Sequence, residues 1–441
     1  MGVNASEERL AQLSRRTFLS MWSYQNPFYR HGKELCDVLV VFGNDVLIFS
    51  DKSIGFKECE DDKELKVAWD RWFRKAVLES IQQLEGALNT IKKRPETIHL
   101  DAKVSSPFPL SLPAPSHARY HLVAIAHGSE ATCLARLGRS SLRFDTRIKG
   151  DEKALSIGYT EGHFVHIFNG TALAALFESM DTTADLIAYL RERRDLFQGR
   201  PLSMEGEEDL IATYMRARRP DGRTTLCDAF GSPGSTFLEV DASAWRSWTG
   251  QPEFSLRRQT LAPAYLVDDV IEHLSSEFTQ GRMIIGQELP VSEHANALHT
   301  LAAEGRMGRY LIGLQVADVL HETPSSFWSV AVESPDQPRV MYIWLIYPMV
   351  DVQISEARLE QAIVEQLHKY VFVAMGKFPT FDTFLGIAMP NAKATRTSRA
   401  YCLAQRNDWT QEMQLESEKL SARENIFDHI ETTVAVISAA I

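Results

Sequence analysis

Four charged side chains flank an apolar hairpin near the start of the 441-residue chain, in the stretch GKELCDVLVVFGNDVLIFSDK. Asp37 stands just before the first apolar run, and Asp51 and Lys52 end the second. Residues equally far from a hairpin turn pair across an antiparallel ladder, so a turn at 43–45 predicts that these three lie side by side. Glu34 precedes Asp37 by three residues, and one turn of helix or loop could direct both carboxylates towards one ion.

This combination of acids and a lysine is typical of sites that hydrolyse phosphodiesters. Such hydrolysis at neutral pH needs a hydroxide-like nucleophile and neutralisation of the charge on the phosphorane. One or two Mg²⁺ ions held by carboxylates supply both, and a neighbouring lysine orients or deprotonates the water and stabilises the transition state. The predicted site therefore holds Mg²⁺ (or Mn²⁺) on Glu34, Asp37 and Asp51, with Lys52 beside the ion.

The elements that would position these residues follow from the hydropathy pattern. Both hairpin strands are apolar on both faces, which is typical of central strands in an α/β sheet. A helical stripe precedes them at 6–22, and apolar residues with a period near 3.6 predict a long helix at 64–93. Segments 97–102 and 120–128 are predicted strands, so the predicted order is helix, hairpin, long helix, strand, strand.

These residues, in this order of elements, resemble the PD-(D/E)xK nuclease superfamily, also called restriction-endonuclease-like. The resemblance covers roughly residues 1–130 and implies an α/β fold with an αβββαβ core at the N-terminus. In that family a glutamate on the preceding helix, an aspartate and a D/E-x-K triplet hold the metal and the water. The resemblance assigns these roles to Glu34, Asp37 and Lys52, and it assigns a catalytic role to Gln83 on the long helix.

The triplet departs from the family pattern, because it reads Ser50-Asp51-Lys52. Strand alternation places Ser50 and Lys52 on one face and Asp51 on the other. Either the strand ends or bulges at Ser50, so that Asp51 takes the acid's role, or the acid is missing and metal binding is impaired. We favour the first interpretation.

Two pairs of neighbouring basic residues could bind anions. Arg74 and Lys75 on the long helix could contact a phosphate backbone, although a solvated helix face is the more common role of such residues. Arg306 and Arg309 lie three apart and would share a helix face. With glycines between them and Glu304 nearby, a solvated turn is the simpler account.

Domain boundaries are predicted from changes in composition. We read the Pro-rich segment 106–115 as an insertion and place a boundary near 145–160. Residues 1–150 then form the nuclease-like domain. Residues 151–441 form a mixed α+β region of unknown role, which could divide again near the Gly-, Pro- and Ser-rich segment 220–262.

Composition narrows the class of protein. The chain is 44% apolar and 24% charged, has no apolar run of the roughly 18–20 residues that a membrane span needs, and has no hydrophobic secretory signal. Its five cysteines are far apart, which argues against a zinc site or a disulfide framework and favours a cytoplasmic protein. A net charge of −11 does not exclude nucleic acid, because binding depends on local basic patches.

The sequence therefore predicts a metal-dependent endonuclease whose substrate is DNA, with RNA as the less favoured alternative, and whose partner is double-stranded DNA. By analogy with the family, it would act in bacterial defence against foreign DNA. Residues 151–441 could bind a second copy or a partner protein. The alternative is a catalytically inactive nuclease-like module that binds nucleic acid or acts as a scaffold. A hydrolase of small nucleotide phosphates is a third candidate.

Overall fold

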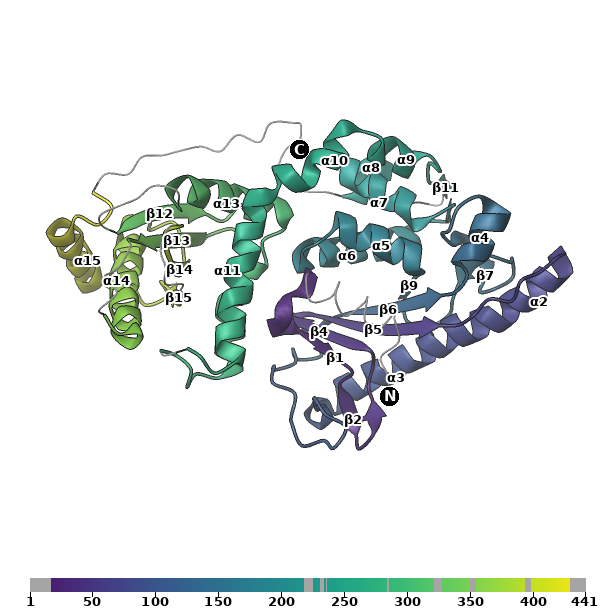
Figure 1. Cartoon of the computed structure of the whole chain (residues 1–441), viewed down its shortest axis with the longest axis horizontal. Coiled ribbons are helices and arrows are strands. Elements are labelled where there is room, and N and C mark those ends of the chain that lie inside the picture. Colours follow the sequence, from purple (N-terminus) through teal and green to yellow (C-terminus); the bar gives the residue numbers. More distant parts are fainter. Residues whose placement is uncertain are drawn as a thin grey trace. The chain divides into compact units, whose positions relative to one another are not determined.

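The structure, a computed structural model, divides into two compact units, Met1–Ser255 and Leu256–Ile441, here called unit 1 and unit 2 (Figure 1). It describes residues 17–217, 225–230, 234, 236–283, 285–320, 327–348, 354–392 and 398–428. The boundary expected near residue 150 falls inside unit 1, whereas the division at 255 falls within the segment 220–262. Of the helix expected at 6–22, residues 17–22 are helical, and the rest lies outside the described residues.

A five-stranded mixed sheet forms the centre of unit 1, with strand order β1-β4-β5-β6-β9. Its strands are β1 (Ser23–Gln25), β4 (Val38–Phe42), β5 (Asp45–Ser53), β6 (Arg119–His127) and β9 (Val165–Phe168). The first three are antiparallel neighbours, and β5, β6 and β9 are parallel. The predicted hairpin is confirmed as β4–β5, and all five residues of β4 are buried. The pairing of β9 with β6 carries the unit past residue 150.

One long helix and a pair of shorter helices cover the two faces of this sheet (Figure 1). The long helix is continuous through α2 (Asp62–Phe73), the π-helical turn η1 (Arg74–Leu78) and α3 (Glu79–Lys93). Its first turn is capped by Asp61, whose side chain accepts a hydrogen bond from the Glu64 amide. The apolar face of α3 packs on β5 and β6. Helices α5 (Gly170–Ser179) and α6 (Thr183–Gly199) lie on the opposite side.

The rest of unit 1 surrounds this core. A second sheet has the order β11-β10-β7-β8, and a small sheet pairs β2 with β3. These strands are β2 (Phe28–Arg30), β3 (Lys33–Glu34), β7 (Arg143–Lys149), β8 (Ser156–Tyr159), β10 (Leu202–Met204) and β11 (Leu238–Glu239). The helices are α4 (Glu130–Leu137), α7 (Glu207–Arg216), α8 (Leu226–Phe230) and α9 (Ala244–Thr249), and α10 (Pro252–Thr260) spans the division. The strand predicted at 97–102 is replaced by a 3₁₀ turn, η2 (Pro95–Thr97), and isolated bridges at His99.

Unit 2 is built on a four-stranded mixed sheet, β12-β13-β14-β15. Its strands are β12 (Trp328–Glu333), β13 (Val340–Tyr347), β14 (Thr383–Pro390) and β15 (Ala400–Gln405). Its helices are α11 (Ala262–Thr279), α12 (Val291–Ala302), α13 (Arg306–Leu320), α14 (Glu356–Lys377) and α15 (Gln411–Glu424). Helix α14 packs on the sheet through one apolar cluster that includes Leu367 and Ile343. None of the described helices in either unit is long and apolar enough to cross a membrane.

The turn expected to be solvated at Glu304 is instead buried. Arg306 and Arg309 form ion pairs with Asp268 of α11 at 2.7 and 2.5 Å, and both arginines are almost fully buried. Glu304 accepts hydrogen bonds from Ser334 and Tyr342, and burial raises its pKa. The sequence could not indicate this arrangement, because Asp268 and Tyr342 are far away along the chain.

A close contact between α11 and α13 gives a prediction for stability. A Cβ atom at Gly313 would lie 2.0 Å from the carbonyl oxygen of Pro263, which is main chain and cannot turn away. We expect Gly313→Ala to force the helices apart and to lower the free energy of unfolding by about 1–3 kcal/mol.

Urea unfolding of this variant measures the effect, with Gly86→Ala as the matched control. Gly86 is an exposed residue of α3 where an added Cβ meets no atom within 4 Å. This control should stabilise the protein by about 0.5–1 kcal/mol, because alanine loses less backbone entropy in a helix. Equal effects of the two substitutions would contradict the predicted clash.

Candidate active site

Asp37 lies at the end of the β4–β5 ladder, as the hairpin predicts. Its amide donates to the carbonyl oxygen of Phe49 over 3.0 Å. Its Oδ2 atom accepts a hydrogen bond from the amide of Asp51 at 2.5 Å. The carboxylate of Asp37 is therefore held against the main chain of β5, one residue before Lys52.

The strand β5 remains regular to its end, so the bulge that we favoured at Ser50 is wrong. It pairs with β6 without interruption from Asp45 opposite Arg119 to Ser53 opposite His127. This parallel neighbour keeps the backbone of β5 extended, and the alternation of its side chains continues. Ser50 and Lys52 therefore share one face, and Asp51 points to the other.

Ser50 and Lys52 face helix α3. The hydroxyl of Ser50 donates to Oε1 of Gln83 over 3.2 Å, so the structure brings this predicted glutamine to the strand. The ammonium of Lys52 lies 3.5 Å from Oε2 of Glu79 and is partly exposed to solvent. On this face the structure joins Lys52, Gln83 and an acid that was not predicted.

Glu79 was missed because it belongs to the helix rather than to the triplet. A signal was present, since Glu79 stands four residues before Gln83 and residues at that spacing share a helix face. Where the family pattern has an acid two residues before the lysine, this chain has Ser50. The acid nearest to Lys52 in the described structure comes from α3 instead.

Asp51 does not join the Lys52 face, which corrects its assignment as a catalytic residue and metal ligand beside Lys52. Its side chain is fully buried, and Oδ1 lies 3.0 Å from Nε2 of His127. Neither carboxylate oxygen has a well-aligned hydrogen-bond donor among the described residues, and the contact with His127 is an ion pair when the imidazole carries its second proton. The other nitrogen of His127 lies 3.8 Å from Glu130, which accepts from the amides of Gly128 and Gly170.

This arrangement keeps His127 charged at neutral pH. Burial alone would lower the pKa of His127, but the Asp51 and Glu130 carboxylates outweigh it and raise the pKa to about 9. The folded protein therefore holds this proton more tightly than the unfolded chain, in which the histidine pKa is about 6.5.

A pH dependence of stability follows from the raised pKa of His127. The protonated His127 ring stabilises the folded protein through its two carboxylate neighbours. This stabilisation is complete below pH 6.5, where the folded and unfolded chains both carry the proton, and it is lost as the pH rises through about 9. The free energy of unfolding of wild type should exceed that of His127→Gln by on the order of 2 kcal/mol at pH 6, after solvent screening. Urea titrations across this range measure the difference. A difference that stays constant from pH 6 to pH 10 would refute the ion pair.

Glu34 lies in the exposed strand β3 of the small sheet, not on a helix before Asp37 as in the family. Burial raises the pKa of the Cys36 thiol, and the charges of Asp37 and Glu34 raise it further, so both carboxylates lie near this sulfur. The residues for which phosphate contacts were considered, Arg74 and Lys75, are exposed on η1.

Two carboxylates, those of Asp37 and Glu79, contact the last residues of β5. Among the described residues, no three His, Cys, Asp or Glu side chains are grouped closely enough to hold a metal ion. The Asp37 carboxylate contacts the amide of Asp51. The Glu79 carboxylate contacts the ammonium of Lys52, the next residue of β5. Mg²⁺ is commonly bound by one or two carboxylates with waters completing its shell, so the oxygen donors of Asp37 and Glu79 are of the type that it prefers.

Comparisons of the chain with protein-family models, with curated proteins and with solved structures find no match.

Proposed function

We propose that unit 1 is a Mg²⁺-dependent nuclease that hydrolyses phosphodiester bonds of DNA. The observation that carries this proposal is the gathering of Asp37, Lys52, Glu79 and Gln83 around the end of β5. The order of elements supports it. Within the central sheet, helical residues 17–22 are followed by β1, β4 and β5, then the α2–α3 helix and β6, which corresponds to the αβββαβ order of the nuclease family that the sequence resembles. The strands β2 and β3 of the small sheet are inserted between β1 and β4.

The roles of the residues follow from their chemistry. Asp37 and Glu79 would hold the ion, which when bound supplies a nucleophilic water and neutralises charge on the phosphate. The Lys52 ammonium, already beside Glu79, would orient the attacking water and stabilise negative charge in the transition state. Gln83 holds Ser50 and so fixes this part of α3 against β5.

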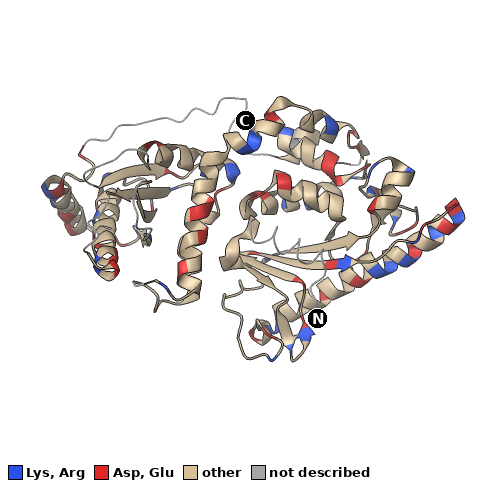
Figure 2. Cartoon of the chain, in the orientation of Figure 1, with Lys and Arg blue, Asp and Glu red and all other residues tan. Residues whose placement is uncertain are grey.

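The charge of the neighbouring helix is compatible with a polyanionic substrate. From residue 62 to 94 there are eight Lys or Arg and five Asp or Glu, and both signs occur along the helix in Figure 2. Phosphate contacts by Lys and Arg supply most of the non-specific affinity for DNA. Arg74 and Lys75 are exposed on this helix and are the candidates for such contacts.

A plasmid-nicking assay tests the proposal. Wild-type protein should nick supercoiled plasmid in the presence of Mg²⁺ or Mn²⁺, and the nicking should stop when a chelator is added. Asp37→Asn keeps the shape of the side chain but removes its charge, so it should abolish nicking while leaving the melting temperature unchanged. Cleavage by Asp37→Asn at the wild-type rate would sink this assignment.

The second candidate function is the catalytically inactive module that binds nucleic acid or acts as a scaffold. The serine at position 50 and the ion pair of Lys52 with Glu79 favour it, because both depart from the family's acid-x-lysine arrangement. Duplex binding without cleavage in the same assay would support this module. Mononucleotides offered as substrates identify the third candidate, a hydrolase of small nucleotide phosphates.

A further inference from the structure

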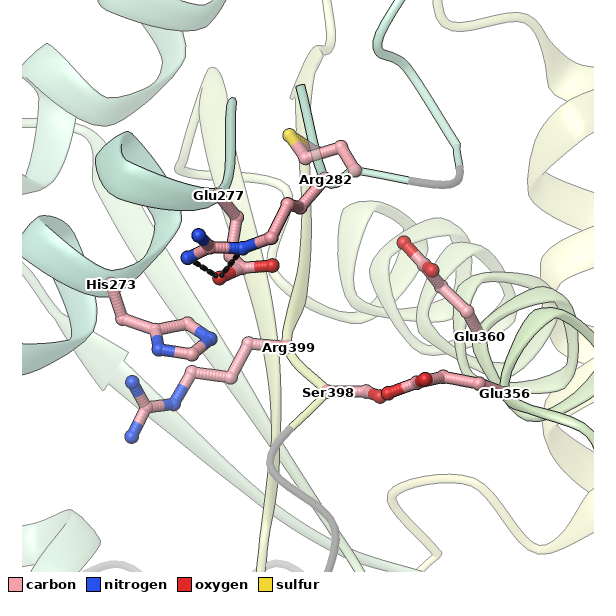
Figure 3. Close-up of a pocket in the computed structure, with 8 residues that line it drawn as sticks. His273, Glu277, Arg282, Glu356, Glu360, Ser398 and Arg399 are labelled. Carbon is pink, nitrogen blue, oxygen red and sulfur yellow. Dashed lines mark hydrogen bonds and ion pairs between the residues drawn. The ribbon is translucent and has the colours of Figure 1, made fainter. Parts of the chain in front are cut away.

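A pocket of about 260 Å³ lies within unit 2, and none of its lining residues takes part in the proposed nuclease site (Figure 3). Helix α11 contributes His273 and Glu277, and helix α14 contributes Glu356 and Glu360. The remaining wall is formed by Arg282, Met283, Ser398 and Arg399. Ionisable side chains thus make up most of the lining, which is unusual for a packing defect, because cavities left by imperfect packing are apolar.

The charges of this pocket are divided between two sides. Figure 3 shows His273, Arg282 and Arg399 on the side of α11, and Glu356 and Glu360 on the side of α14. Arg282 is paired with Glu277 at 2.5 Å, which holds its guanidinium in place. The two sides therefore present opposite charges to a molecule between them.

Arg399, on the cationic side, carries a buried donor that no described residue satisfies. Its Nε atom is buried and has no hydrogen-bond partner among the described residues. Burial lowers the pKa of this guanidinium, and the charge of Asp269 opposes that effect. A buried donor without a partner costs free energy, so an acceptor in the pocket would relieve this cost.

His273 lies beside Arg399 and is available as a neutral ring. Burial lowers the pKa of His273, and the charges of Arg399 and Arg282 lower it further. A neutral imidazole can donate one hydrogen bond and accept another, so it can contact an anionic oxygen without needing a proton from solvent. On the opposite side, Glu356 is exposed in the first turn of α14 and can receive a cation.

We propose that this pocket binds a small zwitterion, with its carboxylate or phosphate on Arg399 and His273 and its ammonium group on Glu356. The volume limits the ligand to a small molecule, because pockets for drug-sized ligands are commonly 300–1,000 Å³. The inference is independent of the proposed nuclease activity, since every lining residue belongs to unit 2.

Calorimetric titration of the full chain tests the proposal with four probes. Phosphoethanolamine and 4-aminobutanoate are zwitterions that end in a phosphate and in a carboxylate. Inorganic phosphate and ethylamine carry only one of the two charges. We expect one or both zwitterions to bind at least about tenfold more tightly than either single-charge probe, a difference of about 1.4 kcal/mol. The zwitterion that binds more tightly identifies the anion.

Three variants connect the binding to the two sides of the pocket. Arg399→Met should weaken every anionic probe at least tenfold. Glu356→Gln should weaken the zwitterions and leave inorganic phosphate unchanged, and because Glu356 is exposed this variant should fold normally. Arg358→Gln, an exposed residue of α14 that does not line the pocket, is the matched control and should have no effect. Any one of three results would overturn the proposal: zwitterions that bind no better than phosphate, no binding in the millimolar range, or an unchanged zwitterion affinity in Glu356→Gln.

Discussion

Changing Lys52 to methionine is expected to reduce metal-dependent DNA cleavage by about 1,000-fold, which is the scale on which a positioned base or a transition-state charge contributes. Methionine preserves most of the length and apolar volume of the side chain. The ammonium that lies 3.5 Å from Glu79 is lost, and with it the cation that we propose acts on the phosphate. Initial rates of plasmid nicking measure the effect.

The variant Glu79→Gln tests the role of Glu79, on α3, separately from that of Asp37, which precedes β4. If Glu79 replaces the missing acid of the triplet, this variant should lose as much activity as Asp37→Asn and should need more Mg²⁺ for half-maximal rate. Lys93→Met is the matched control for Lys52→Met, since Lys93 is exposed near the C-terminal end of α3. Full activity in both Lys52→Met and Glu79→Gln would exclude the site at the end of β5.

Changing Arg193 to leucine is expected to lower the free energy of unfolding by about 3–5 kcal/mol, the largest effect on stability that we predict. Arg193 and Glu207 are almost completely buried in unit 1 and form two hydrogen bonds of 2.8 and 2.9 Å. Removing the guanidinium leaves the Glu207 carboxylate buried with only the Tyr189 hydroxyl as its remaining hydrogen-bond donor among those described. An unpaired charge inside a core is far more costly than the pair is beneficial.

The surroundings of Arg193 make relaxation difficult. Its guanidinium lies over the rings of Phe144, Phe168 and Phe197, 4.3 Å from the centroid of the last, so water cannot easily replace it. Arg194→Leu is the matched control, because Arg194 is partly exposed and pairs only with its neighbour Asp195 among described residues. That change should alter stability by less than about 0.5 kcal/mol. Urea unfolding of both variants measures the difference, and equal midpoints would refute the prediction.

The agreement between sequence and structure was best where information is local. The apolar runs of β4 and β5 and the Gly-containing turn between them identified the hairpin. A period near 3.6 identified the long helix. Both patterns report which faces of an element are buried, and both hold without knowledge of distant residues.

The disagreements arose where distant residues determine the environment. The bulge favoured at Ser50 is absent because β6, about 70 residues later, pairs with β5 over its whole length. Asp51 is buried against His127 for the same reason. Composition predicted a domain boundary near residue 150. The same sheet continues beyond that point, because β9 pairs with β6, and composition does not report this pairing.

The sequence by itself determined which side chains stand at the ends of the hairpin, and that Asp37 would meet the end of β5. Only the tertiary structure decided which acid accompanies Lys52. The direction of each side chain on β5 depends on an unbroken ladder with β6, and Glu79 approaches only because α3 packs across that strand. Pairing and packing between distant segments set these directions, and local patterns do not encode them.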